Sequence, residues 1–206
     1  MRLLRYCVAV GLIAGVFVPV FGQQEAKKPA AKPPMDEKAA MEMMMKLATP
    51  SEGHKKLDVL VGTWNATNKM WMDPDPSKPP SVSQGVSEHK WVLGGRFLEQ
   101  RFEGQFMGMP YTGLGYTGYD NYKKKYVGVW MDTAGTAMMN SIGSFNTAGK
   151  VLRTTARMDD FTTGKVMTVR ENLTIAGNDE VKMEIFGPAP DGKEYRMMEI
   201  VYTRKK

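Results

Sequence analysis

The chain has 206 residues, of which 42% are apolar and 24% are charged, a balance typical of a folded protein. This composition excludes collagen, coiled coils and low-complexity polymers. The 28 Lys and Arg exceed the 22 Asp and Glu to give a formal net charge of +6, but the basic residues are spread along the chain, so the charge alone does not indicate nucleic-acid binding.

The first 22 residues have the pattern of an export signal. Arg2 and Arg5 precede an apolar run over residues 6–21, and Val20-Phe21-Gly22 supplies small residues for a cleavage site. This pattern predicts a secretory signal peptide over residues 1–22. The run is shorter than the roughly 20 residues of a transmembrane helix, and no second apolar run follows it. We therefore expect an exported protein, periplasmic or extracellular, without a transmembrane segment after cleavage; an uncleaved anchor is the alternative.

The segment after the predicted cleavage site is expected to be a flexible linker. Residues 23–34 consist of Gln, Glu, Ala, Lys and Pro, which cannot bury enough apolar surface to offset the entropy of ordering them. Cys7 is the only cysteine, so the mature chain has no thiol and its core must stabilise the fold without disulfides. Because Cys7 lies inside the apolar run and not at its end, a lipoprotein is not expected.

Short helices are predicted over residues 35–60. Helix-forming residues occupy residues 35–47, and Asp36 is a candidate N-cap. Pro50 ends this helix, and a second short helix is expected to follow it and to stop at Gly62.

After Gly62 the apolar residues alternate with polar ones, as in β-strands. Short segments rich in Gly, Asn and Asp separate ten such runs and fit hairpin turns. The runs cover residues 62–72, 82–92, 96–106, 111–119, 125–132, 136–145, 150–159, 165–176, 179–187 and 194–204. Consecutive antiparallel strands without a crossover helix form an up-and-down barrel or a sandwich. We predict an all-β fold for residues 61–206, a single antiparallel barrel of about ten strands, because closure removes exposed edges.

The alternation also predicts which side chains point into the barrel. In the third run the apolar face is expected to point inward, with Arg96, Leu98, Gln100, Phe102 and Phe106. The fourth and ninth runs are expected to direct inward Leu114, Tyr116, Val181, Met183 and Ile185. The fifth, sixth and eighth runs have two faces that the alternation does not distinguish.

Several short motifs resemble one bacterial family. They are His54-Lys55-Lys56-Leu57, Gly62-Thr63-Trp64, Leu93-Gly94-Gly95-Arg96-Phe97, Gly108-Met109-Pro110, Gly118-Tyr119-Asp120-Asn121, Trp130-Met131-Asp132 and Ile200-Val201-Tyr202-Thr203-Arg204. Together they resemble DUF1579, an exported family of unknown function with a calycin-like fold, the fold of lipocalins and fatty-acid-binding proteins. The resemblance covers about residue 48 to the end. It implies a fold and a compartment, and no activity.

The calycin resemblance also implies a role for two residues. It places Arg204, near the end of the last strand, against the ring of Trp64 in the first strand, where the pair closes one end of the barrel. A guanidinium over an indole contributes about 0.5–2 kcal/mol, depending on how far it is desolvated. The short helix before the first strand is expected to cover the same end.

Metal and haem sites have few candidate ligands in this chain. The only histidines are His54 and His89, and the one cysteine lies in the predicted signal peptide. His89 shares its strand parity with Ser87 and Trp91, so a haem ligand there is an alternative to an ordinary strand histidine. The methionines at 41, 43, 44 and 45 allow a Cu(I) site, although a methionine-rich helix face more often packs against apolar surface. We predict neither a metal nor a cofactor.

Enzymatic and nucleic-acid sites are not indicated. No Gly-x-Ser-x-Gly elbow and no glycine-rich phosphate loop occurs, and Ser141 lies in a predicted strand. Glu99 and Glu103 share a charged outer face with Arg101. The basic run at residues 122–126 spans one hairpin turn, where lysines discourage edge pairing, so no nucleic-acid partner is predicted.

The function we predict is binding of a small apolar or amphipathic molecule inside the barrel, without covalent chemistry. The residues expected to line the site are Gln100, Phe102, Tyr116, Trp130, Met138, Asn140 and Arg170. Arg170 lies on a mixed face of the eighth run, and a buried Arg would require an anionic group on the ligand. The alternative is that Met167, Val169, Leu173 and Ile175 point inward and that Arg170 is a surface cation.

Two other functional classes stay open. One is an interaction or structural module of the cell envelope whose barrel interior is filled by its own side chains, and the other is a barrel enzyme. Period counting does not distinguish these classes, because interior volume depends on the packing of individual side chains.

Overall fold

The computed structural model describes residues 36–160 and 163–206. The predicted signal peptide over residues 1–22 and the predicted linker over residues 23–34 lie outside the described residues. No helix in the described part of the chain has the length and apolar character to span a membrane.

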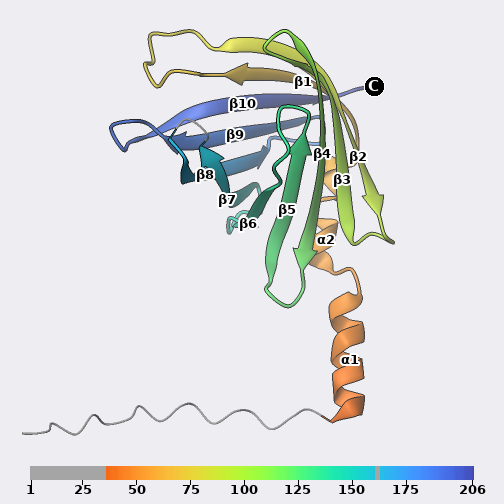
Figure 1. Cartoon of the computed structure of the whole chain (residues 1–206). Coiled ribbons are helices and arrows are strands. Elements are labelled where there is room, and N and C mark those ends of the chain that lie inside the picture. The colour runs from red at the N-terminus through yellow and green to blue at the C-terminus, as the bar shows by residue number, and fades with distance from the viewer. Residues whose placement is uncertain (1–35, 161–162) are drawn as a thin grey trace, which may run out of the picture. The chain divides into compact units, whose positions relative to one another are not determined.

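Short helical elements come first in the described chain (Figure 1). They are α1 (Glu37–Ala48), α2 (Glu52–Lys55) and the 3₁₀ turn η1 (Asp58–Leu60). Ser51 begins α2 in an extended conformation, and its backbone N–H donates a hydrogen bond of 3.0 Å to Nδ1 of His54. This bond satisfies a donor that the first turn of a helix leaves without a backbone partner.

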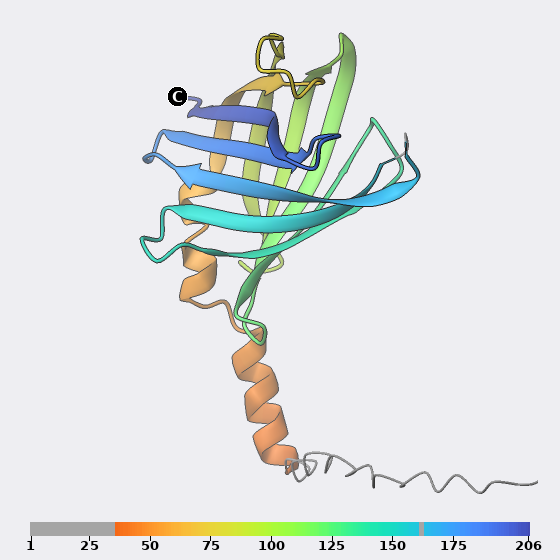
Figure 2. The same cartoon turned by 90° about the vertical axis from the view of Figure 1, so that its left-hand side faces the viewer.

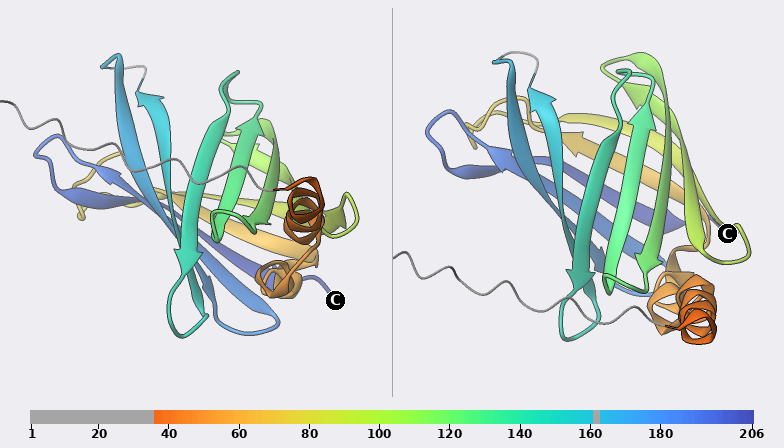
Figure 3. Two further views of the ribbon diagram at one scale, coloured as in Figure 1. Left: turned by 90° about the horizontal axis from the view of Figure 1, so that it is seen from below. Right: turned by 60° about the horizontal axis from the view of Figure 1, so that its bottom comes forward.

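Ten antiparallel strands follow and close into a barrel. They are β1 (Gly62–Met70), β2 (Ser81–Val92), β3 (Phe97–Phe106), β4 (Met109–Asp120), β5 (Lys125–Asp132), β6 (Met139–Phe145), β7 (Val151–Asp160), β8 (Lys165–Ile175), β9 (Glu180–Pro188) and β10 (Glu194–Arg204). Each strand pairs with its neighbours in sequence, and β1 also pairs with β10. The predicted up-and-down barrel of ten strands is confirmed, and Figures 2 and 3 show the sheet curving round on itself.

The seam between β1 and β10 depends on Trp64 and Arg204, which are directly opposite each other in the two strands. Trp64 is 1% exposed, and its indole N–H donates to the carbonyl of Leu60 at 2.8 Å. The Arg204 guanidinium lies 4.1 Å from the indole ring centre and donates to the carbonyls of Val59 and Val61, each at 2.8 Å. Arg204 therefore ties the end of the last strand to the chain entering the first, as the family resemblance implied.

The hydrophobic core includes the end of the barrel that Trp64 and Arg204 close. Leu57 and Leu60, from the segment before β1, are buried against the interior residues. Leu98 and Phe102 of β3 and Val181 of β9 belong to the same cluster. The predicted inward face of the ninth strand is therefore correct, and so is that of the third strand at Leu98 and Phe102. The prediction is wrong for Arg96, which precedes β3, is exposed and donates to the carbonyl of Leu93.

Replacing Arg204 with Lys tests the seam. Lysine keeps the charge but loses the planar fork that reaches two carbonyls at once. We expect Arg204→Lys to lower the free energy of unfolding by about 1–3 kcal/mol in urea titrations, because buried carbonyls lose their donors. Arg101→Lys, at an exposed position of β3, is the control and should change stability by less than about 0.5 kcal/mol. Equal effects of the two substitutions would contradict this role of Arg204.

Candidate functional site

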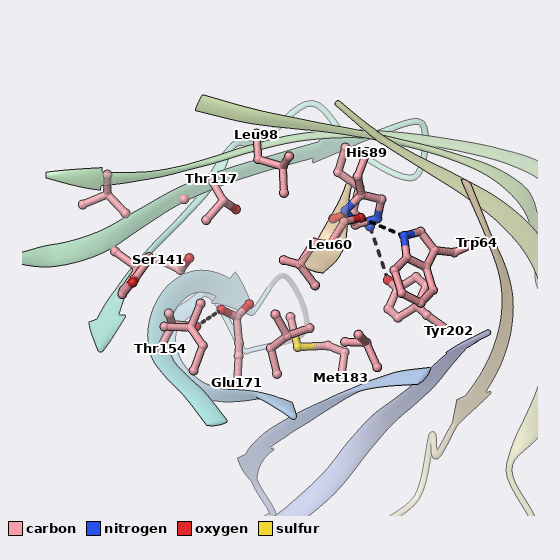
Figure 4. A pocket seen from close by; sticks show the side chains of 17 residues that line it. Leu60, Trp64, His89, Leu98, Thr117, Ser141, Thr154, Glu171, Met183 and Tyr202 are labelled. Atoms are coloured by element: carbon pink, nitrogen blue, oxygen red, sulfur yellow. Dashed lines mark hydrogen bonds between the residues drawn. The ribbon is translucent and has the colours of Figure 1, made fainter. Parts of the chain in front are cut away.

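A cavity of about 90 Å³ lies inside the barrel, and every strand contributes to its wall (Figure 4). Its apolar and aromatic lining consists of Leu60, Trp64, Leu98, Tyr126, Val127, Leu152, Leu173, Val181, Met183 and Tyr202. Its polar lining consists of His89, Gln100, Thr117, Ser141, Thr154 and Glu171. A water needs about 10–15 Å³ by this measure, and a 150 Å³ cavity holds benzene. The space therefore fits several waters or a compact organic molecule.

One polar group on the wall is built around His89. This side chain is 8% exposed, and its Nε2 lies 2.9 Å from the hydroxyl of buried Ser87. Gln100 donates from Nε2 to Ser87 Oγ at 3.1 Å and to the hydroxyl of Tyr202 at 3.3 Å. Nδ1 of His89 has no hydrogen-bond partner among the described residues. His89, a residue that lines the cavity, thus has a buried ring nitrogen without a partner among the described residues.

His89 is uncharged at neutral pH. Burial lowers the pKa of this imidazole to about 4, with a further contribution from the positive charge of Arg204. A neutral imidazole has one nitrogen that donates and one that accepts, so Nδ1 is a donor or an acceptor according to the tautomer, and in both cases it lacks a partner among the described residues.

Glu171 forms the second polar group, across the cavity from His89 (Figure 4). Its side chain is 5% exposed and accepts a hydrogen bond from the hydroxyl of Thr154. Burial raises the pKa of this carboxyl, and hydrogen bonds from Thr154 and Ser141 oppose that rise. Of the residues that the structure describes, no Lys or Arg lines the cavity or forms an ion pair with Glu171. The carboxyl is thus buried without a cation.

Three of the seven residues predicted to line the site point into the barrel. Gln100 lines the cavity itself. Phe102 is buried in the core and packs edge-on against Tyr111, with ring centres 5.7 Å apart. Trp130 packs against the core and donates from Nε1 to Asp132 at 2.9 Å. Phe102 and Trp130 are therefore interior residues that do not line the cavity.

The predicted inward position of Tyr116 is wrong, and so is that of Leu114. Tyr116 points outward and donates to the carboxylate of Glu99 at 2.9 Å. The inward positions in this part of β4 are Gly113 and Gly115, where an added Cβ would lie 2.1 Å and 2.8 Å from atoms of the Trp130 ring. Glycine leaves the space that this ring occupies, and the alternation therefore places Leu114 and Tyr116 on the outer face.

Met138 and Asn140 also lie away from the interior. The sequence predicted that this strand begins at residue 136, but β6 begins at Met139. Met138 therefore precedes the strand, and its side chain is 59% exposed. Asn140 is exposed on the outer face, because its neighbour Ser141 lines the cavity and successive strand residues alternate. The prediction that these two side chains point inward is wrong.

Arg170 is a surface cation, as in the alternative that the sequence left open. Its guanidinium pairs with Glu194 at 2.6 Å and lies 4.1 Å from the ring centre of Phe186. Val169 and Leu173 face inward in its place. Glu171 belongs to this inward face and was missed. The sequence did contain a signal for its inward position, because Glu171 lies on the same strand face as the apolar residues Val169 and Leu173.

The other sequence candidates lie apart from one another in the described part of the chain. Within residues 36–160 and 163–206, no group of three or more His, Cys, Asp or Glu is placed to hold a metal ion. The methionines of α1 are exposed, and α1 has no buried residue among those described. Ser141 lies in strand β6 as expected.

The comparison with protein families shows which family the chain belongs to. The model described as "Protein of unknown function (DUF1579)" matches residues 49–204. The chain belongs to the DUF1579 family. No curated protein matches the chain.

Several solved structures are similar to this DUF1579 chain. Rv2717c from M. tuberculosis is 16% identical with a TM-score of 0.56, and the match covers 77% of this chain and 100% of that one. A redesigned β-barrel, b11L5F_LGL, is 16% identical with a TM-score of 0.38 and coverages of 73% and 96%. EF1p2_mFAP2b, solved bound to DFHBI, is 10% identical with a TM-score of 0.40 and coverages of 74% and 99%. The likeness to Rv2717c shows the fold alone.

The depressed pKa of His89 predicts how this DUF1579 protein loses stability in acid. As the pH falls, the unfolded chain takes up a proton near 6.5, before the folded chain does near 4. Stability contributed by the neutral ring is therefore present above pH 6.5 and lost as the pH falls to about 4. Between pH 7 and pH 4 the native chain should lose up to about 3 kcal/mol more than His89→Phe, measured by urea unfolding. Identical pH dependence of the two chains would contradict the burial of a neutral His89.

Proposed function

We propose that this protein binds a small molecule inside its barrel, without covalent chemistry. The proposal rests on the cavity inside the barrel and on its lining residue His89, whose Nδ1 has no hydrogen-bond partner among the described residues. Leaving a buried polar group without a hydrogen bond costs about 1–3 kcal/mol, and a ligand that bonds to this nitrogen removes the cost.

The cavity limits the size of the molecule. At about 90 Å³ the space is smaller than one that holds benzene, so a long acyl chain does not fit without movement of the walls. The ligand class best supported is a compact amphipathic molecule, with an apolar part against Leu98, Leu173 and Val181 and a polar end toward His89 or Glu171. This is narrower than the apolar or amphipathic class expected from the sequence.

Export belongs to the proposal as well. The two arginines and the apolar run within residues 1–22 support a signal peptide, and with it a periplasmic or extracellular site of action. Ligands in that compartment would be small molecules that cross the outer layers of the cell or come from the medium.

Filling the cavity tests the proposal. Thr117 of β4 lines the cavity, and Thr117→Phe puts a ring into it. We expect the native chain to bind butan-1-ol in ligand-observed NMR and Thr117→Phe to lose that binding. Thr112→Phe, at an exposed position of the same strand, is the matched control and should bind like the native chain.

The opposite result has a clear meaning. If the native chain binds no small probe, and organic extraction of natively purified protein yields no defined molecule by mass spectrometry, the barrel is a filled module and the proposed function is wrong. Recovery of one compact molecule from the native chain, and not from Thr117→Phe, supports it.

A further inference from the structure

The polar lining of the cavity carries one acidic group with an unusual environment. Glu171 lies on the inward face of β8 between Val169 and Leu173, and 95% of its surface is buried. Its hydrogen-bonding partners, Thr154 and Ser141, are neutral hydroxyls. Among the described residues, one other glutamate is buried: Glu199, which has Arg196 at 2.7 Å and Lys69 at 3.4 Å. Glu171 is therefore buried without the cation that such a group has elsewhere in this barrel.

A carboxyl in this state is expensive to bury. Buried charges in proteins are normally paired, because taking a carboxylate out of water costs several kcal/mol that only a nearby cation or several hydrogen bonds recover. Replacing Glu171 by an apolar residue of similar size would remove this cost, and the β8 face around it is otherwise apolar. An unpaired ionisable group in a cavity is a candidate for a binding role.

The rest of the wall favours a positive partner. Trp64, Tyr126 and Tyr202 supply aromatic rings to the same cavity, and aromatic rings attract cations through their negative faces. Among the described residues no Lys or Arg lines the cavity, so nothing in the lining competes for the carboxylate. An anionic ligand would find no Lys or Arg among the lining residues to pair with.

We propose that Glu171 anchors the positive end of a small organic amine in the barrel. This inference rests on the proposed function and adds the charge of the ligand to it. The expected charge of the ligand is the opposite of the one that the sequence suggested. An inward Arg170 would have required an anionic group on the ligand, but Arg170 lies on the outer face and pairs with Glu194. The apolar wall and the volume of about 90 Å³ limit the rest of the amine to a short alkyl or similar group.

Three probes of matched size separate charge from shape: butylamine, butan-1-ol and butyrate, titrated at pH 7 into the full chain and followed by ligand-observed NMR. We expect butylamine to bind at least about tenfold more tightly than butan-1-ol, because it completes a buried charge pair. Butyrate should show no binding at the same concentrations.

Glu171→Gln keeps the shape and the hydrogen bond from Thr154 but removes the charge. This variant should lose the preference for butylamine, by about tenfold, and keep its affinity for butan-1-ol. Glu194→Gln removes the same charge from the outer face, where Glu194 pairs with Arg170, and is the control that should leave all three affinities unchanged.

The outcomes are distinguishable. If no probe binds the native chain, the proposed function fails and this inference fails with it. If butan-1-ol binds as tightly as butylamine, or if Glu171→Gln leaves butylamine binding intact, the cavity binds small molecules but Glu171 does not select an amine. If butyrate binds best, the charge assigned to the ligand is wrong.

Discussion

Closure of the sheet is the constraint on which the interior depends. Each strand is hydrogen-bonded on both sides, and β1 completes the ring by pairing with β10. A strand held on both sides cannot shift by one residue without breaking two ladders, so the side of the sheet that each residue faces is fixed. Trp64 and Arg204 lie at the point where the first and last strands meet, and they hold the two strands and the preceding segment together.

This constraint places polar groups in an interior that gives them few partners. On the outer face several charges are paired, as Arg170 is with Glu194 and Arg196 with Glu184. Inside, His89 keeps an unpartnered nitrogen and Glu171 a carboxyl without a cation. Burial shifts their pKa values in opposite directions, downward for His89 and upward for Glu171, and in both cases favours the neutral form. Burial of these two polar groups lowers the stability of the folded state, and such a local cost is typical of sites that bind ligands.

The strands and their order could be predicted from the sequence, because alternation and turn residues recur ten times. The interior of β3 was also predictable, since Leu98 and Phe102 alternate with charged residues. In β4 the prediction failed because the inward residues are glycines that make room for Trp130, a ring from another strand. In β8 a shift of one residue decides whether Arg170 or Glu171 points into the barrel. Pairing with the neighbouring strands fixes that register, and the local sequence pattern does not. Contacts between strands therefore determine which residues line the cavity.

The proposed site requires Glu171 to lie inside the barrel as a carboxyl without a cation. A carbon-detected NMR titration of the glutamate carboxyl resonances measures this property, with Glu171→Gln used to assign the signal. We expect the pKa of Glu171 to lie above the ordinary glutamate value of 4.5, because burial disfavours the ion. A Glu171 pKa at or below that value would show a solvated or paired carboxylate and would rule out this environment.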